Sequence, residues 1–233
     1  MSMPMMEPIR TPFADAGRVA RPAGRGRRSV GAGAVRAALG PSRALAGAVI
    51  LGFGLLLAGC STPVPTFDLS APSGFTAGGS GSAQLVVTTP TALAVLNTDK
   101  IVVEPTPGQL AYLGDAQWGD SLPSLLQARI IQAFENASKL KRVARPGDGV
   151  VAQYQLVTDI RMFGLRVTPE GPVAVVELSA KVIGNADGRI VAAQVFRGQA
   201  PASGSSGAAA TAALDQASNQ VLTALVRWAS AKF

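Results

Sequence analysis

The stretch SLPSLLQARIIQAFENA, residues 121–137, predicts a long helix and thereby sets the fold class. Asp120 or Ser121 can cap it, and Pro123 suits a first helical turn. Apolar side chains then repeat at three- and four-residue spacing, at Leu122, Leu125, Leu126, Ile130, Ala133, Phe134 and Ala137. One face of the helix is therefore expected to pack against the rest of the domain, and the opposite, polar face to meet solvent.

Strands are predicted on both sides of this helix. Before it, residues 85–87 and 100–104 are short β-branched runs, each followed by a proline. After it, apolar and polar side chains alternate over 154–162 and 174–182, which is typical of strands with one wet face. The apolar set of the first of these two strands is Tyr154, Leu156, Ile160 and Met162. Turn residues then precede a third strand, 189–197, so an antiparallel meander is expected.

A second amphipathic helix is predicted from about residue 208 to residue 231. Its apolar face carries Leu214, Ala217, Val221, Leu222, Leu225 and Trp228. Two such helices and a sheet with one wet face predict that both helices cover the other face. The expected fold class is α+β, with two layers: a mainly antiparallel sheet and two long amphipathic helices on one of its faces.

The sequence Leu57-Ala58-Gly59-Cys60 closes an uncharged apolar run, residues 44–58, that follows an arginine-rich segment. A positive region, a short apolar region and small residues in this order indicate a secretory signal peptide. The run is shorter than the roughly 20 residues that a membrane-spanning helix needs. The tetrapeptide resembles the lipobox of bacterial lipoproteins, which implies signal peptidase recognition at Leu57, Ala58 and Gly59 and lipidation of Cys60. A buried or idle cysteine after an uncleaved anchor is the alternative.

The expected organisation has three parts. Residues 1–59 form a signal peptide with a long disordered leader, because their Arg, Ala, Gly and Pro content buries too little apolar surface to fold. Residues 60–83 form the lipidated cysteine and a flexible tether rich in Pro, Gly and Ser, in which residues 66–69 can form a short edge strand. Residues 84–233 form a single periplasmic domain.

Of the net charge of +7, the leader carries +6 and the rest of the chain only +1, so the charge does not indicate a nucleic-acid partner. Eight arginines face two acidic residues before Cys60, whereas 13 basic and 12 acidic residues follow from Cys60 on. The chain has no histidine and one cysteine, which excludes Ser-His-Asp and Cys-His nucleophiles and zinc sites built from these residues. No cofactor or metal is expected, although carboxylate chemistry at Asp159 and Glu177 remains open.

With these elements placed, the chain resembles the ABC-type transport auxiliary lipoproteins, the family that includes paraquat-inducible protein C. The resemblance rests on Phe67-Asp68-Leu69 soon after Cys60, and on Leu110-Ala111-Tyr112-Leu113 followed by Trp118-Gly119-Asp120-Ser121-Leu122-Pro123. It implies a non-enzymatic accessory lipoprotein that works with an ABC permease and ATPase complex and an MCE-domain protein in lipid transport. Because exposed aromatic side chains are frequent in interfaces, Tyr112 and Trp118 are candidate partner-binding residues, with core packing as the alternative.

Ser61 after the cysteine is similar to the signal that sends enterobacterial lipoproteins to the outer membrane. We therefore expect a lipid anchor at the periplasmic face of the outer membrane, with the inner membrane as the alternative and homo-oligomerisation left open. A second function stays open: a general envelope-assembly or lipid-chaperone lipoprotein that is not linked to an ABC transporter. That function would require an apolar cavity between the helices and the sheet.

Overall fold

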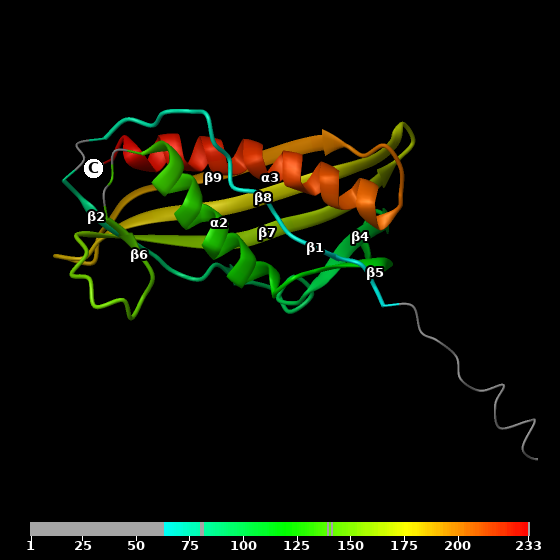
Figure 1. Cartoon of the computed structure of the whole chain (residues 1–233), viewed down its shortest axis with the longest axis horizontal. Helices are drawn as coiled ribbons and strands as arrows, with labels where there is room; N and C mark the ends of the chain where they lie inside the picture. Colours follow the sequence, from blue (N-terminus) through cyan, green and yellow to red (C-terminus); the bar gives the residue numbers. More distant parts are fainter. Residues whose placement is uncertain (1–62, 80–81, 139, 141, 233) are drawn as a thin grey trace, which may run out of the picture. The chain divides into compact units, whose positions relative to one another are not determined.

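The computed structural model describes residues 63–79, 82–138, 140 and 142–232. The elements in chain order are β1 (Thr66–Phe67), β2 (Gln84–Val87), β3 (Thr91–Ala92), β4 (Lys100–Thr106), β5 (Gln109–Trp118), α2 (Leu122–Ala137), β6 (Arg142–Ala144), β7 (Tyr154–Thr168), β8 (Gly171–Gly184), β9 (Ile190–Pro201) and α3 (Gly207–Ser230). The predicted α+β fold class is confirmed, with the expected meander, β7 to β9, between the two expected helices (Figure 1).

The sheet is built around β7, the longest strand at 15 residues. One edge of β7 pairs with β8 in antiparallel fashion, and β8 pairs with β9 in the same way. On its other edge, β7 pairs in parallel with β2, β3 and β4, which follow one another along its length. The sheet is therefore mixed and only largely antiparallel, because the three short strands reach β7 through loops and not through hairpins.

The strand β7 contains a bulge that interrupts the alternation of buried and exposed side chains predicted from the sequence. Ile160 pairs with Leu178 and Met162 with Glu177, so Arg161 is an extra residue on β7. A bulge shifts the phase of the side chains by one residue. The buried side chains are accordingly Leu156 and Ile160 before the bulge but Phe163 and Leu165 after it, and Met162 is only half-buried. The prediction that Met162 shares a face with Ile160 is wrong.

The two helices lie in front of the long strands in the view of Figure 1. Helix α3 packs against β8 and β9, and α2 packs against α3 and lies over β2 and β6. As expected, α2 follows Ser121 and has a proline in its first turn. The Ser206 side chain accepts a hydrogen bond from the Ala209 N–H and caps α3. The largest side chains between the helices and the sheet are fully buried, among them Leu126, Ile130, Phe134, Leu156 and Phe163.

Candidate functional site

The four residues of the predicted lipidation signal, Leu57, Ala58, Gly59 and Cys60, lie outside the described residues. Lipidation of Cys60 and peptidase recognition at the three residues before it therefore stay predictions. The described chain begins at Pro63, so the structure shows how the segment that follows the signal is held.

That segment, residues 66–77, is called the strap here because it is fastened to both helices and to the sheet. At its start, β1 pairs in parallel with β5, Thr66 opposite Gln117 and Phe67 opposite Trp118. The Leu69 side chain is 3% exposed and belongs to the hydrophobic core. At its end, the Ala77 N–H donates to the Ala137 carbonyl at the end of α2, at 2.8 Å. A flexible tether was expected here, whereas the structure holds these residues against the domain.

Polar contacts fix the strap between its two ends. The Arg129 guanidinium of α2 donates a hydrogen bond to the Asp68 carboxylate. The Asn136 Nδ2 of α2 donates to the Pro72 carbonyl at 3.3 Å. The Phe75 ring lies under Arg227 of α3, with the guanidinium carbon 5.4 Å from the ring centre, within the range of a cation–π interaction.

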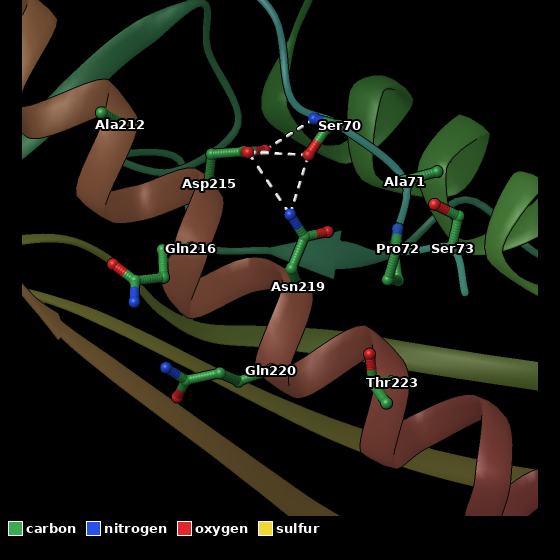
Figure 2. A pocket seen from close by; sticks show the side chains of 10 residues that line it. All are labelled: Ser70, Ala71, Pro72, Ser73, Ala212, Asp215, Gln216, Asn219, Gln220 and Thr223. Atoms are coloured by element: carbon green, nitrogen blue, oxygen red, sulfur yellow. Dashed lines mark hydrogen bonds between the residues drawn. The ribbon is translucent and has the colours of Figure 1, made fainter. Parts of the chain in front are cut away.

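The strongest network joins the strap to α3 (Figure 2). The Ser70 N–H and hydroxyl donate to the two carboxylate oxygens of Asp215, at 2.6 and 2.7 Å. The Asn219 amide in turn donates to the Ser70 Oγ at 2.8 Å and to Asp215 Oδ2 at 3.3 Å. These residues line an open hollow of about 820 Å³ between the strap and α3. The lining is mostly polar and its central groups bond to one another, so the network serves to attach the strap.

The ionisation of Asp68 follows from the same attachment. The hydrogen bond from the Arg129 guanidinium holds the pKa of the Asp68 carboxyl below its ordinary value of 3.8, and burial works in the opposite direction. A hydrogen bond from the Leu69 N–H, at 2.7 Å, further favours the charged form. Asp68 therefore stays ionised and keeps its contact with α2 at neutral pH.

The two candidate partner-binding residues lie on one strand, β5, in opposite environments. Trp118 is 2% exposed, and its ring packs edge-to-face on Phe163 with a centre-to-centre distance of 5.9 Å. A side chain this deeply buried is a core residue and does not meet a partner in this structure. Tyr112 is 47% exposed, and its hydroxyl donates a hydrogen bond to the Val95 carbonyl at 3.3 Å. Tyr112 as a contact residue stays a prediction.

Strands β4 and β5 form a hairpin whose far part, residues 105–114, is called the hairpin tip. Residues 109–112 of β5 are exposed, and Leu110 and Tyr112 lie two residues apart on one face of the strand. On the edge of β5 away from β4, the described residues pair only at Gln117 and Trp118, where β1 lies. The edge of the tip is thus left open.

Two prolines explain why the chain does not cover that edge itself. The Gln117 N–H donates to the Pro65 carbonyl and the Gly119 N–H to the Phe67 carbonyl, so Pro65 and Phe67 face β5. In a parallel pair every second residue bonds to the neighbouring strand, so the next residue toward the N-terminus that would bond to β5 is Pro63. Proline has no N–H to donate, so residues 63–65 cannot extend β1 along the tip.

The turn of the hairpin is fixed by Glu104. Its carboxylate accepts hydrogen bonds from the Gly108 N–H at 3.0 Å and from the Arg166 Nε of β7 at 2.6 Å. The bond from Gly108, followed by that from Arg166, holds the pKa of the Glu104 carboxyl below its ordinary value of 4.5. The charges of Glu104 and Arg166 are thereby paired with each other, and the tip is held against the sheet.

Two further features of the described part of the chain concern membranes and metals. Neither α2 nor α3, the described helices, is long and apolar enough to cross a membrane. Within residues 63–79, 82–138, 140 and 142–232, no three carboxylate, thiol or imidazole side chains gather in a way that could hold a metal ion.

The structure defines an α+β domain to which the strap is fastened, and comparison with known proteins gives its family. A sequence model of the family described as ABC-type transport auxiliary lipoprotein component matches residues 66–226, from β1 into α3. The chain belongs to this family, as the residues around Tyr112 and Trp118 suggested. Membership in a lipoprotein family indicates the cell envelope as its location.

Individual relatives agree with this assignment. An uncharacterised protein of Bradyrhizobium diazoefficiens is 34% identical over 165 residues, which are 70% of this chain but 44% of that longer protein. A crystal structure of a Xanthomonas campestris protein of the DUF330 family is 32% identical, with a TM-score of 0.66 over 73% of this chain and 96% of that one. A crystal structure of another uncharacterised protein, 13% identical with a TM-score of 0.57, covers 72% of this chain and all of its own, and shares the fold alone.

Sequence reasoning did not find the residues that hold the strap. Arg129 and Asn219 are ordinary polar residues on wet helix faces, and Asp215 lies 145 positions from Ser70. No local pattern connects such distant residues. The one sequence signal was the pair Phe67 and Leu69, which are spaced as on a strand and turn toward the domain.

Proposed function

We propose that this protein is a non-enzymatic, lipid-anchored accessory component of an ABC-type lipid transport system associated with an MCE-domain protein. It acts through protein contacts in the periplasm of a Gram-negative cell, from an anchor in the outer membrane. The observation that carries the proposal is the match of the auxiliary lipoprotein family over residues 66–226, which includes the strap and most of α3. The MCE partner and the choice of membrane rest on the resemblance and on Ser61 after the cysteine.

The fastening of the strap supports a function that depends on the anchor. A lipid on Cys60 would be separated from β1 by only residues 61–65. Because the strap is bound to β5, α2 and α3, a force or constraint at Cys60 would reach the whole domain. Two or three acyl chains would hold it on the membrane stably, whereas one chain gives only marginal binding.

Asp159 and Glu177, the two carboxylates considered for catalysis, have structural partners, which supports a non-enzymatic role. Asp159 Oδ1 accepts a hydrogen bond from the Thr91 hydroxyl at 2.9 Å, between β7 and β3. Glu177 lies 3.7 Å from the Arg161 guanidinium, across β7 and β8. Each carboxylate thus joins two strands on its own, whereas general acid–base catalysis usually uses groups that converge on one cavity.

The alternative of a lipid chaperone requires an apolar cavity between the helices and the sheet. Leu126, Ile130 and Phe134 of α2 are fully buried there and belong to one cluster with side chains of β7 and β8. Side chains that fill this space favour binding at the surface over enclosure of a lipid.

The decisive test of the anchor is the substitution Cys60→Ala. We expect the variant to lose membrane retention completely and to keep its unfolding free energy, because the lipid and the hydrophobic core share no residue. Fractionation of the native host and intact-mass spectrometry of the membrane form measure this; the wild type should have the mass of residues 60–233 plus a diacylglyceryl group. Wild-type fractionation of the variant would refute lipidation.

The transport role has its own test. Purification of the lipidated protein from gently solubilised membranes should recover ABC permease, ATPase and MCE-domain subunits of the same host. The Cys60→Ala protein provides the matched control, since its domain is intact but displaced from the membrane. A correctly lipidated protein that recovers none of these subunits would favour a lipoprotein unconnected to ABC transport.

A further inference from the structure

The hairpin tip has a composition unusual for an exposed strand. From Pro105 to Gly114 it carries no charged residue, and Leu110 and Tyr112 are 48% and 47% exposed. Soluble proteins commonly protect open strand edges with charged residues, especially lysine. An uncharged tip with an aliphatic and an aromatic side chain instead suits a boundary at which an apolar layer meets water.

The hairpin tip is held in place against the sheet. The Glu104 carboxylate holds the turn through the Gly108 N–H and is itself paired with Arg166 of β7. A carboxylate that is satisfied in this way brings no unpaired charge to the tip. The nearby β7–β8 turn carries Glu170, but β4 and β7 separate β8 from β5, so three strand spacings of about 4.8 Å, or about 14 Å, lie between them.

The length of the chain before the strap determines which end of the sheet meets the membrane. Cys60 precedes Thr66 by six residues, which can span at most about 20 Å. The strand β1 is parallel to β5, so the chain before it leaves toward the hairpin turn, as Figure 1 shows for its first described residues. β5 extends about 20 Å in that same direction, because β4 pairs with it over only six residue steps, from Lys100 opposite Gln117 to Thr106 opposite Gln109.

Even when fully extended, the link to the anchor therefore reaches about as far as the hairpin beside it. We propose that the hairpin tip lies in the lipid–water interface of the membrane, with Leu110 and Tyr112 as its lipid contacts. This inference rests on the proposed lipid anchor at Cys60. The open edge of β5 keeps the tip in the hydrated headgroup region, because unpaired backbone groups are not tolerated in the hydrocarbon core.

A strand from a partner protein could also add to the open edge of β5. The lipid surface is favoured because a link of at most about 20 Å keeps the tip close to the membrane wherever the chain keeps its direction at β1. A protein partner would have to occupy the same narrow space between domain and membrane.

The test uses the full chain, lipidated in a bacterial host and reconstituted into vesicles of phosphatidylethanolamine and phosphatidylglycerol. Because Cys60 is the only cysteine and its thiol is consumed by the lipid, Leu110→Cys introduces one free thiol for an environment-sensitive fluorophore. The matched control is Ile190→Cys, an exposed aliphatic position (57%) at the opposite end of the sheet. Quenching by lipids brominated on their acyl chains, and flotation of the vesicles, are measured on both labelled proteins.

We expect the label at 110 to shift its emission to shorter wavelength and to be quenched by brominated lipid, and the label at 190 to remain as in water. Equal emission and quenching at both positions, in protein that floats with the vesicles, would overturn the assignment of the tip to lipid. A change at 110 that appears only after MCE-domain protein is added would also overturn it, in favour of a protein contact. Protein that does not float would refute the anchor itself, a failure distinct from that of the tip.

Discussion

The two halves of β5 belong to the same strand but have opposite environments. The half formed by residues 115–118 pairs with β1 at Gln117 and Trp118 and with β4 at Gln117, and it ends in the buried Trp118. Residues 109–114 pair with β4 alone among the described strands and expose Leu110 and Tyr112. The strap makes the difference, because its strand β1 covers the first half, and the prolines before it, Pro63 and Pro65, prevent the chain from covering the second half.

This contrast indicates a division between the two halves of β5, one serving stability and the other contacts with other molecules. The covered half belongs to the core, so substitutions there should change stability. The open half contributes little to the core, so substitutions there should change contacts with other molecules and leave stability nearly unchanged. The following substitutions test this division from the largest expected effect to the smallest.

The largest effect is expected from Trp118→Ala. It removes a fully buried ring that packs on Phe163, which should lower the free energy of unfolding by about 3–5 kcal/mol. The matched control, Tyr112→Ala in the open half, should change it by less than about 0.5 kcal/mol. Urea unfolding followed by far-UV circular dichroism measures both, and equal losses would contradict the division.

Gly207→Ala should have the next largest effect, because α3 begins directly on the covered half. An added Cβ would lie 2.9 Å from the Asp115 carbonyl oxygen and closer still to the Ala116 Cβ. Overpacking of this kind commonly destabilises by about 1–3 kcal/mol. Gly204→Ala is the control, since nothing lies within 4 Å of its added Cβ. A thermal melt in which both variants match the wild type would show that α3 shifts freely away from β5.

Asp215→Ala removes the acceptor of both Ser70 hydrogen bonds and should cost about 1–2 kcal/mol. The more specific consequence is faster amide exchange along the strap, because its attachment to α3 is lost. Gln216→Ala is the matched control: it lines the same hollow but points away from the network in Figure 2. Unchanged exchange at residues 68–72 of Asp215→Ala would mean that the contacts with α2 hold the strap alone.

The smallest effect concerns the turn of the open half and depends on pH. The folded pKa of Glu104 lies below its unfolded value, near 4.5, so the contribution of its charge to stability is complete above that pH and is lost as the pH falls through the folded pKa. Glu104→Gln should therefore be less stable than the wild type at neutral pH, and the difference should shrink as the pH falls below 4.5 through the folded pKa. A stability difference that stays constant with pH would assign the effect to shape and not to charge.

The sequence predicted the parts of the fold whose pattern is local. Ser121 and Pro123 mark the start of α2, and the alternation from Ala174 to Val182 gives the buried face of β8 correctly. The strand β5 was missed because its tip is exposed on both faces, so no alternation exists there. The phase change in β7 was missed because a bulge depends on pairing with β8, which no local pattern encodes.

The candidate site was predicted only in part for the same reason. Aromatic residues at 112 and 118 look alike in the sequence, and only the neighbours brought by the fold, Phe163 for one and solvent for the other, separate them. The strap was expected to be part of a tether because the wider segment, residues 60–83, is rich in proline, glycine and serine. Its attachment depends on Arg129 and Asp215, which lie 61 and 145 positions away from their partners.

The order of pairing along β7 has a consequence for the synthesis of this protein. Leu85 and Val103 of β2 and β4 find their partners only at Tyr154 and Leu165, and Ser70 finds its partner only at Asp215. A chain that emerges with its N-terminus first must therefore expose the edges of β2, β3 and β4 that pair with β7 before β7 exists. Such distant pairings slow folding and expose strand edges meanwhile. We expect a newly made chain to need protection from aggregation until α3 has been synthesised.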